Sequence, residues 1–189
     1  MLRGLPGGVI AGVAFTTLLL VIARWDVRAR RIPNGLVLAL AATGLLAAAT
    51  VLRREVGLGP ALGGMATGFA IWLPLWLLRV IGAGDVKLAA AIGAWVGWPG
   101  ILQATVLGVL AGGVLAVGML ARRGAMGRLA TDVALWFGAW RIGGASAAVA
   151  ARPTPASHRR EVLPYGVALA TGALLVAWLP APWLQWLAW

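Results

Sequence analysis

The sequence of 189 residues contains no cysteine, one histidine and five acidic side chains. The lack of cysteine excludes disulfides, cysteine-ligated zinc and thiol catalysis. The single histidine, His158, is too few for a histidine-built metal site. Only 11% of the residues are charged, whereas 61% are hydrophobic, and a soluble domain of this size needs a more polar surface. The composition therefore predicts a polytopic membrane protein that uses no metal or cofactor.

The formal net charge of +11 is the one global feature that suggests nucleic acid as a partner. The basic residues, however, fall in short clusters between apolar runs, which is the pattern of cytoplasmic loops in membrane proteins. We therefore predict no nucleic-acid partner and a lipid bilayer around most of the chain.

Six apolar runs have lengths that suit membrane helices of about 20 residues. They lie at approximately 5–24, 33–52, 58–79, 86–100, 101–121 and 163–187. The fourth run is short and meets the fifth at Trp98-Pro99-Gly100, a turn signal that predicts a tight hairpin. The first run is long for a signal peptide and no small-residue cleavage site follows it, so we interpret it as a retained span. The predicted fold is an all-α polytopic membrane protein with six transmembrane helices in a single domain, 1–189.

The distribution of arginine and lysine predicts the orientation in the membrane. Of the 16 basic residues, 13 lie on one side of the predicted spans. These are Arg24, Arg28, Arg30, Arg31, Arg79, Lys87, Arg122, Arg123, Arg128, Arg141, Arg152, Arg159 and Arg160, whereas Arg3, Arg53 and Arg54 lie on the other side. The positive-inside rule makes the first side cytoplasmic. Both termini are therefore predicted to lie outside.

The longest polar segment, residues 122–162, lies between the fifth and sixth predicted spans and is predicted to be cytoplasmic. Its first half has apolar residues at helical spacing and an i, i+4 pair of Arg128 and Asp132, which predicts an amphipathic helix on the inner membrane surface. Its second half contains Pro153 and Pro155, which are typical of a flexible tether.

Asp85 stands out because the motif Gly82-Ala83-Gly84-Asp85-Val86-Lys87 places a carboxylate in a very apolar part of the sequence. An ionisable group at membrane depth costs about 2.5 to 3.5 kcal/mol, so it indicates a functional site. Gly82 and Gly84 would let a substrate strand approach the acid closely. Lys87 is expected to tune Asp85 or to bind a substrate carboxylate, although a lysine reaching the head groups is equally consistent with this position.

Asp26 is the second acid without an ordinary explanation, and it is predicted to lie at the same membrane face as Asp85. If the two helices pack together, the two carboxyls can share one proton, and one can then activate water while the other polarises a peptide carbonyl. Plain salt bridges remain open as alternatives: Asp26 with the neighbouring arginines, and Asp85 with Lys87 or Arg79. Asn34, at the start of the second predicted span, is expected to cap that helix.

Three stretches together resemble one protein family. They are Trp25-Asp26 followed by Arg30-Arg31-Ile32-Pro33-Asn34, then Gly82-Ala83-Gly84-Asp85-Val86-Lys87-Leu88, and later Leu163-Pro164-Tyr165-Gly166. In motif order and helix number the chain is similar to the type IV prepilin peptidases, the membrane aspartyl proteases with a Gly-x-Gly-Asp motif.

The resemblance implies a function, a site and a location. Asp26 and Asp85 would be the catalytic pair, supported by Gly82, Gly84, Lys87, Pro33 and Asn34. The enzyme would remove leader peptides from prepilins or pseudopilins at the cytoplasmic face of the bacterial inner membrane.

One departure from the family pattern bears on a second activity. Long members of the family carry paired Cys-x-x-Cys motifs and also methylate the new N-terminus, whereas this chain has no cysteine. It resembles the short form that serves tight-adherence (Flp-type) pili, so no methyltransferase activity is expected. The alternative from another class is a non-enzymatic inner-membrane transporter or pilus-assembly scaffold. Whether the chain forms a homo-oligomer is left open.

Overall fold

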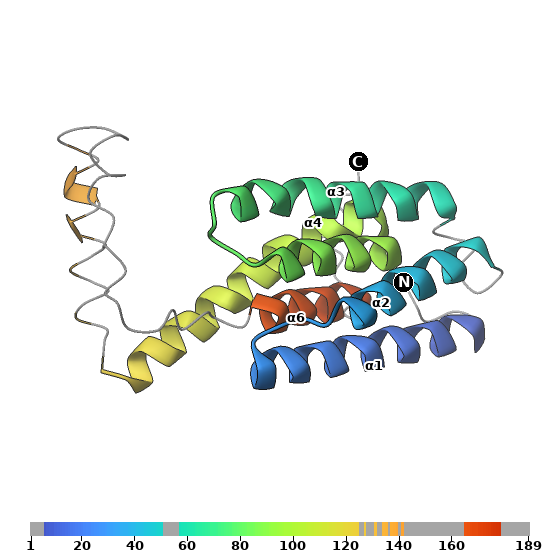
Figure 1. Ribbon diagram of the computed structural model, residues 1–189, viewed down its shortest axis with the longest axis horizontal. Coiled ribbons are helices and arrows are strands. Elements are labelled where there is room, and N and C mark those ends of the chain that lie inside the picture. Colours follow the sequence, from blue (N-terminus) through green and yellow to red (C-terminus); the bar gives the residue numbers. More distant parts are fainter. Residues whose placement is uncertain are drawn as a thin grey trace. The chain divides into compact units, whose positions relative to one another are not determined.

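The computed structural model describes residues 6–50, 57–124 and 165–178, together with positions 127, 131, 134, 135, 137–139 and 141. The regular structure within these residues is helical, as the sequence predicts (Figure 1). The chain forms two compact units, of which one contains residues 1–112 and 164–189 and the other contains residues 113–163.

The larger unit contains four whole helices and most of a fifth. These are α1 (Pro6–Ala29), α2 (Asn34–Ala49), α3 (Leu58–Leu77), α4 (Ala83–Arg122), which continues into the smaller unit, and α6 (Tyr165–Trp178). By length and composition, α1 from Val9 onward, α3 and α4 are long and apolar enough to cross a membrane, whereas α2 and α6 are shorter apolar helices. Of the predicted spans, residues 5, 51–52, 163–164 and 179–187 lie outside the described residues.

Two of the helix ends that differ from the predicted spans concern the acids. Helix α1 continues past the predicted end near residue 24 to Ala29. It ends at Arg30, which has a positive φ of 50° and whose N–H donates to the carbonyl oxygen of Asp26 at 2.8 Å. Helix α4 begins at Ala83, ahead of the predicted start at 86. Asp26 therefore lies within the last turns of α1, and Asp85 lies within the first turn of α4.

Helix α4 consists of two helical halves that meet at Gly97, where φ is 75° and ψ is 177°. The backbone oxygen of Ala89 and Cγ1 of Ile101 lie 2.5 and 3.1 Å from the place that a Cβ on Gly68 of α3 would take. A continuous helix would separate Ala89 from Ile101 by about 18 Å, so the chain must turn back between them (Figure 1). The predicted hairpin is present, but it turns at Gly97, where glycine tolerates the positive φ.

Close helix contacts in this unit are made by glycines. A Cβ on Gly64 of α3 would collide with the backbone of Gly93 in α4, and a Cβ on Gly93 would collide with that of Gly64. Gly172 of α6 meets the backbone of Ala104 and Gly108 in the same way. Small residues at such crossings let helices approach closely enough for strong van der Waals contact, which drives helix association in membranes.

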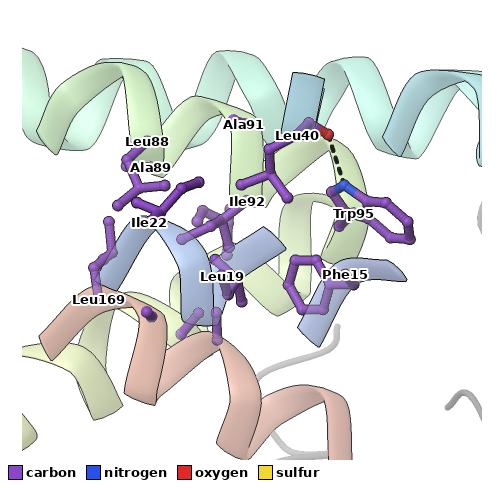
Figure 2. Packing of buried hydrophobic residues seen from close by; sticks show 14 of the residues in the cluster. Phe15, Leu19, Ile22, Leu40, Leu88, Ala89, Ala91, Ile92, Trp95 and Leu169 are labelled. Atoms are coloured by element: carbon purple, nitrogen blue, oxygen red, sulfur yellow. Dashed lines mark hydrogen bonds between the residues drawn. The ribbon is translucent and has the colours of Figure 1, made fainter. Parts of the chain in front are cut away.

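The core of the unit lies where α1, α2, α4 and α6 converge (Figure 2). Its largest fully buried side chain, Trp95, stacks on Phe15 at a centroid distance of 5.0 Å and donates its indole N–H to the carbonyl oxygen of Leu40 at 2.7 Å. Two further indoles bond across helices, Trp72 to Thr105 at 3.3 Å and Trp178 to Thr16 at 2.9 Å. Lipid tails offer no hydrogen-bond partners, so these bonds provide an acceptor for each indole N–H within the protein.

The smaller unit is described only in part. Beyond the end of α4, the described positions between 127 and 141 are helical, and the Thr131 hydroxyl donates to the carbonyl oxygen of Gly127 at 2.9 Å. Leu135 and Phe137 are exposed. These positions agree with a helix in this segment, whereas the predicted pair of Arg128 and Asp132 lies outside the described residues.

Candidate active site

Asp26 is held by the first turn of α6. Its side chain is only 7% exposed, and its Oδ2 accepts a hydrogen bond from the backbone N–H of Gly166 at 3.0 Å. The first N–H groups of a helix have no partner within the helix, so an acceptor from elsewhere can bind them. Asp26 of α1 therefore provides an acceptor for the Gly166 amide in the first turn of α6.

Asp85 is held by its own helix. It is 8% exposed, and its Oδ2 accepts the backbone N–H of Gly82 at 3.2 Å, while its own N–H donates to the Gly82 carbonyl oxygen at 3.1 Å. A carboxylate that reaches back to the residue before the helix is one half of a capping box. The local sequence thus fixes the position of Asp85.

Ile32 connects the surroundings of the two acids. Its Cβ lies 3.3 Å from the place of a Cβ on Gly84, and its Cδ1 lies 3.1 Å from the place of a Cβ on Gly166. Gly84 directly precedes Asp85, and Gly166 binds Asp26, so one half-buried isoleucine packs against a neighbour of each acid. The structure thus brings the surroundings of Asp26 and Asp85 together at Ile32.

Lys87 and Asn34 also come together, although not as the sequence suggested. The Lys87 ammonium donates to Oδ1 of Asn34 at 3.1 Å, and both side chains are exposed. The expected capping of α2 by Asn34 is wrong, because the N-cap residue is Pro33, without a side-chain cap bond, and Asn34 is the first helical residue. The Asn34 amide instead joins the start of α2 to the first turn of α4.

The two glycines of the Gly-x-Gly-Asp motif occupy different surroundings. Neither has a positive φ, so the backbone conformation does not require glycine at either position. A Cβ on Gly82 would lie 3.3 Å from Oδ2 of Asp85, and one on Gly84 would lie 3.3 Å from Cβ of Ile32. The missing side chain at position 84 makes room for Ile32. The sequence alone did not reveal this reason for a glycine at that position.

Sequence reasoning assigned no role to Ile32 or Gly166. Ile32 lay within the Ile-Pro-Asn element, and Gly166 lay in the Pro-Tyr-Gly turn before the last helix. That turn was the available signal, because a glycine at a helix start often admits close approach of another group. What it approaches depends on the packing of α6 against α1.

The arrangement consists of two buried carboxyls, each bound by a backbone amide, with Ile32 packed against a residue beside each of them. Among the described residues, no three histidine, cysteine, aspartate or glutamate side chains gather as a metal site would need. A carboxyl pair of this kind can supply a general base and a general acid to one substrate.

Comparison with known proteins gives the family. The model of the Type IV leader peptidase family matches residues 13–117, a stretch that includes both aspartates. This chain therefore belongs to the type IV leader peptidase family. Together with the long apolar helices, this membership identifies it as an integral membrane protein.

Several relatives carry the name prepilin leader peptidase/N-methyltransferase. The chain is 34% identical to the one from Klebsiella pneumoniae over 114 residues, which cover 57% of this chain and 48% of the relative. It is 31% identical to the one from Burkholderia pseudomallei (strain K96243) over 153 residues, which cover 77% of this chain and 48% of the relative. The match thus spans about half the length of these relatives. No solved structure gives a significant match.

Proposed function

We propose that this protein is a membrane aspartyl endopeptidase that removes the leader peptide of prepilin or pseudopilin substrates, with Asp26 and Asp85 as its catalytic pair. The observation that carries the proposal is that both carboxyls are buried and that Ile32 packs against Gly84, which precedes Asp85, and against Gly166, which binds Asp26. Membership of the leader peptidase family and the names of the relatives support the same reaction.

The chemistry follows from a pair of carboxyls that share one proton. The ionised carboxyl takes a proton from a water molecule, whose oxygen attacks the carbonyl carbon of the scissile peptide. The protonated carboxyl gives its proton to the carbonyl oxygen, and collapse of the tetrahedral intermediate transfers a proton to the leaving amine. We assign the two roles to the pair and not to either residue.

The backbone amides of Gly82 and Gly166 contribute to this proposal by fixing one oxygen of each carboxyl. A bond to backbone requires no long side chain to be ordered, so each carboxyl keeps its position while substrate binds. Holding reacting groups in place in this way accounts for a large part of enzymatic rate acceleration.

The proposed setting is the bacterial inner membrane, with six spans and both acids near the cytoplasmic face. The excess of basic residues on one side supports this orientation. The proposed substrate is a Flp-type prepilin, which enters as a membrane helix. Lys87 and Asn34 lie exposed at the starts of α4 and α2 and are suited to bind a carboxylate or a backbone carbonyl of that substrate.

Methyl transfer, the second half of the relatives' name, is not part of the proposal. The long family members that methylate carry Cys-x-x-Cys pairs, and this sequence contains no cysteine. A cleavage reaction supplied with a methyl donor would test this point, because the mass of the released mature pilin reports whether its N-terminus has been methylated.

The test is cleavage of a purified Flp-type prepilin in liposomes by the wild type, Asp26→Asn and Asp85→Asn. Asparagine preserves the size of the side chain but cannot act as a base. Glu55→Gln is the matched control, because it also removes one negative charge but precedes α3 in the sequence, whereas Asp85 follows α3.

The proposal predicts cleavage by the wild type and by Glu55→Gln, with a loss of at least about 10³-fold in both aspartate variants, as for essential members of a catalytic unit. Substantial cleavage by either aspartate variant would remove that residue from the chemistry. If the wild type cleaved no prepilin or pseudopilin, a transporter or scaffold would become the better reading.

A further inference from the structure

The contact between Asp26 and α6 joins residues that are 140 positions apart in the sequence. The N–H of Gly166 donates to Oδ2 of Asp26 at 3.0 Å in a buried setting. The acid of α1 is therefore fixed only when α6 is packed against α1.

Glycine at position 166 leaves room for this carboxyl. A Cβ there would lie 2.7 Å from Oδ2 and 3.1 Å from Cγ of Asp26, and 3.1 Å from Cδ1 of Ile32. The first of these distances is shorter than van der Waals contact allows. Because Gly166 has no positive φ, its conformation does not explain the glycine. Any side chain at this position must displace the Asp26 carboxyl.

Gly108 is also closely packed, but its neighbours are not the acids. Gly108 of α4 lies against the backbone of α6, where a Cβ would be 3.3 Å from the Ala168 oxygen and from the Leu169 Cα. It tightens the packing of α4 against α6 without touching either acid. Gly108 therefore offers a matched comparison for the same kind of substitution.

We propose that Gly166 is a positioning residue, which sets the place of the Asp26 carboxyl through its N–H and its missing side chain. This inference rests on the proposed function, since it assigns Gly166 a part in the same cleavage. It also makes the docking of α6 a requirement for an assembled site.

The experiment measures kcat and KM for prepilin cleavage in Gly166→Ala and Gly108→Ala, together with the thermal stability of each. Because misplacement of a reacting group by about 1 Å can cost roughly 10²-fold in rate, we expect Gly166→Ala to lose about that much in kcat with little change in KM. Gly108→Ala should show any loss in stability and keep its kcat.

A second variant tests whether displacement of the Asp26 carboxyl or crowding of Ile32 causes the loss of kcat in Gly166→Ala. Ile32→Val removes the methyl group Cδ1 that an alanine at position 166 would also touch. If displacement of Asp26 causes the loss, Ile32→Val combined with Gly166→Ala should stay as slow as Gly166→Ala. Recovery of kcat in the double variant would show that crowding of Ile32 is the cause and would overturn the inference.

Hydrogen exchange tests the contact independently of activity. In wild type, the Gly166 amide should exchange slowly, and Asp26→Ala should accelerate it. Unchanged exchange would contradict the contact. If the wild type cleaves prepilin and Gly166→Ala is equally active, this inference alone is overturned. If the wild type does not cleave prepilin, the proposed function and the positioning role are both contradicted.

Discussion

Asp26 and Asp85 are buried to nearly the same extent, but the chain holds them in different ways. Asp85 accepts the N–H of Gly82, three residues before it, in the first turn of its own helix. Asp26 lies near the end of α1 and accepts the N–H of Gly166 in α6. One carboxyl is thus placed by local structure and the other by tertiary structure. The two acids should therefore respond differently to changes elsewhere in the protein.

Apart from changes to the aspartates themselves, the largest effect is expected from a change to Ile32, which packs beside both of them. Ile32→Ala deletes most of the side chain that packs against both Gly84 and Gly166. Both carboxyls then lose a neighbour, so we expect kcat to fall by roughly 10²-fold, measured by prepilin cleavage. Ile32→Val keeps the Cβ that approaches Gly84 and loses only Cδ1, the atom nearest Gly166, so we expect a smaller loss and use it for comparison. Equal activity of the alanine and valine variants would show that Ile32 does not set the site.

Removing each acid in turn compares the stability contributed by the tertiary contact of Asp26 with that contributed by the local contact of Asp85. Asp26→Ala leaves the buried Gly166 N–H without its acceptor, which costs about 1–3 kcal/mol in the free energy of unfolding. Asp85→Ala exposes the N–H of Gly82, an exposed residue, to solvent, so its cost should be closer to about 0.5 kcal/mol. Thermal unfolding in detergent, followed by tryptophan fluorescence, measures both. A larger loss for Asp85→Ala would reverse the comparison.

Gly82→Ala probes the tolerance of the local contact. The new Cβ would lie 3.3 Å from Oδ2 of Asp85, a distance that a shift of a few tenths of an ångström relieves, and the donating N–H is kept. We expect kcat to fall only a few-fold, against roughly 10²-fold for the corresponding change at Gly166. Prepilin cleavage by the two variants, assayed side by side, makes the comparison, and equal losses would contradict it.

The smallest effect on stability is expected at Lys87. Its bond to Asn34 is exposed, and exposed polar contacts change stability by about 0.5 kcal/mol or less. Lys87→Gln should therefore keep the thermal stability of the wild type while raising KM for prepilin if the ammonium binds substrate. A fall in stability with unchanged KM would instead make the Lys87 and Asn34 pair a structural link between α2 and α4.

Much of the fold could be predicted because apolar runs and turn residues act locally. The glycine and proline near residue 98 predicted the reversal of α4, although Gly97 makes the turn. The end of α1 was misplaced because Arg30 adopts a positive φ that arginine rarely takes, so no sequence signal marked it.

The site was predictable to the extent that its signals are local. Asp85 follows glycines at a helix start, and its capping bond to Gly82 is a short-range contact. The partners of Asp26 could not be inferred, because Gly166 reaches it only through the packing of α1 against α6. The cap assigned to Asn34 was wrong for the same reason: Lys87 of another helix binds the amide oxygen.

The most direct test of the account is whether Asp26 and Asp85 lie together in the membrane. Because the sequence contains no cysteine, Asp26→Cys with Asp85→Cys creates the only thiol pair. The control pairs Asp26→Cys with Leu62→Cys. Leu62 lies in α3, two residues before Gly64, which contacts Gly93 of α4. Because Gly93 is about 12 Å along α4 from Asp85, position 62 lies well away from the proposed site. A short bifunctional thiol reagent should link the first pair within one chain and leave the control unlinked. Failure to link the first pair, or equal linking of both, would contradict a single site built from these two aspartates.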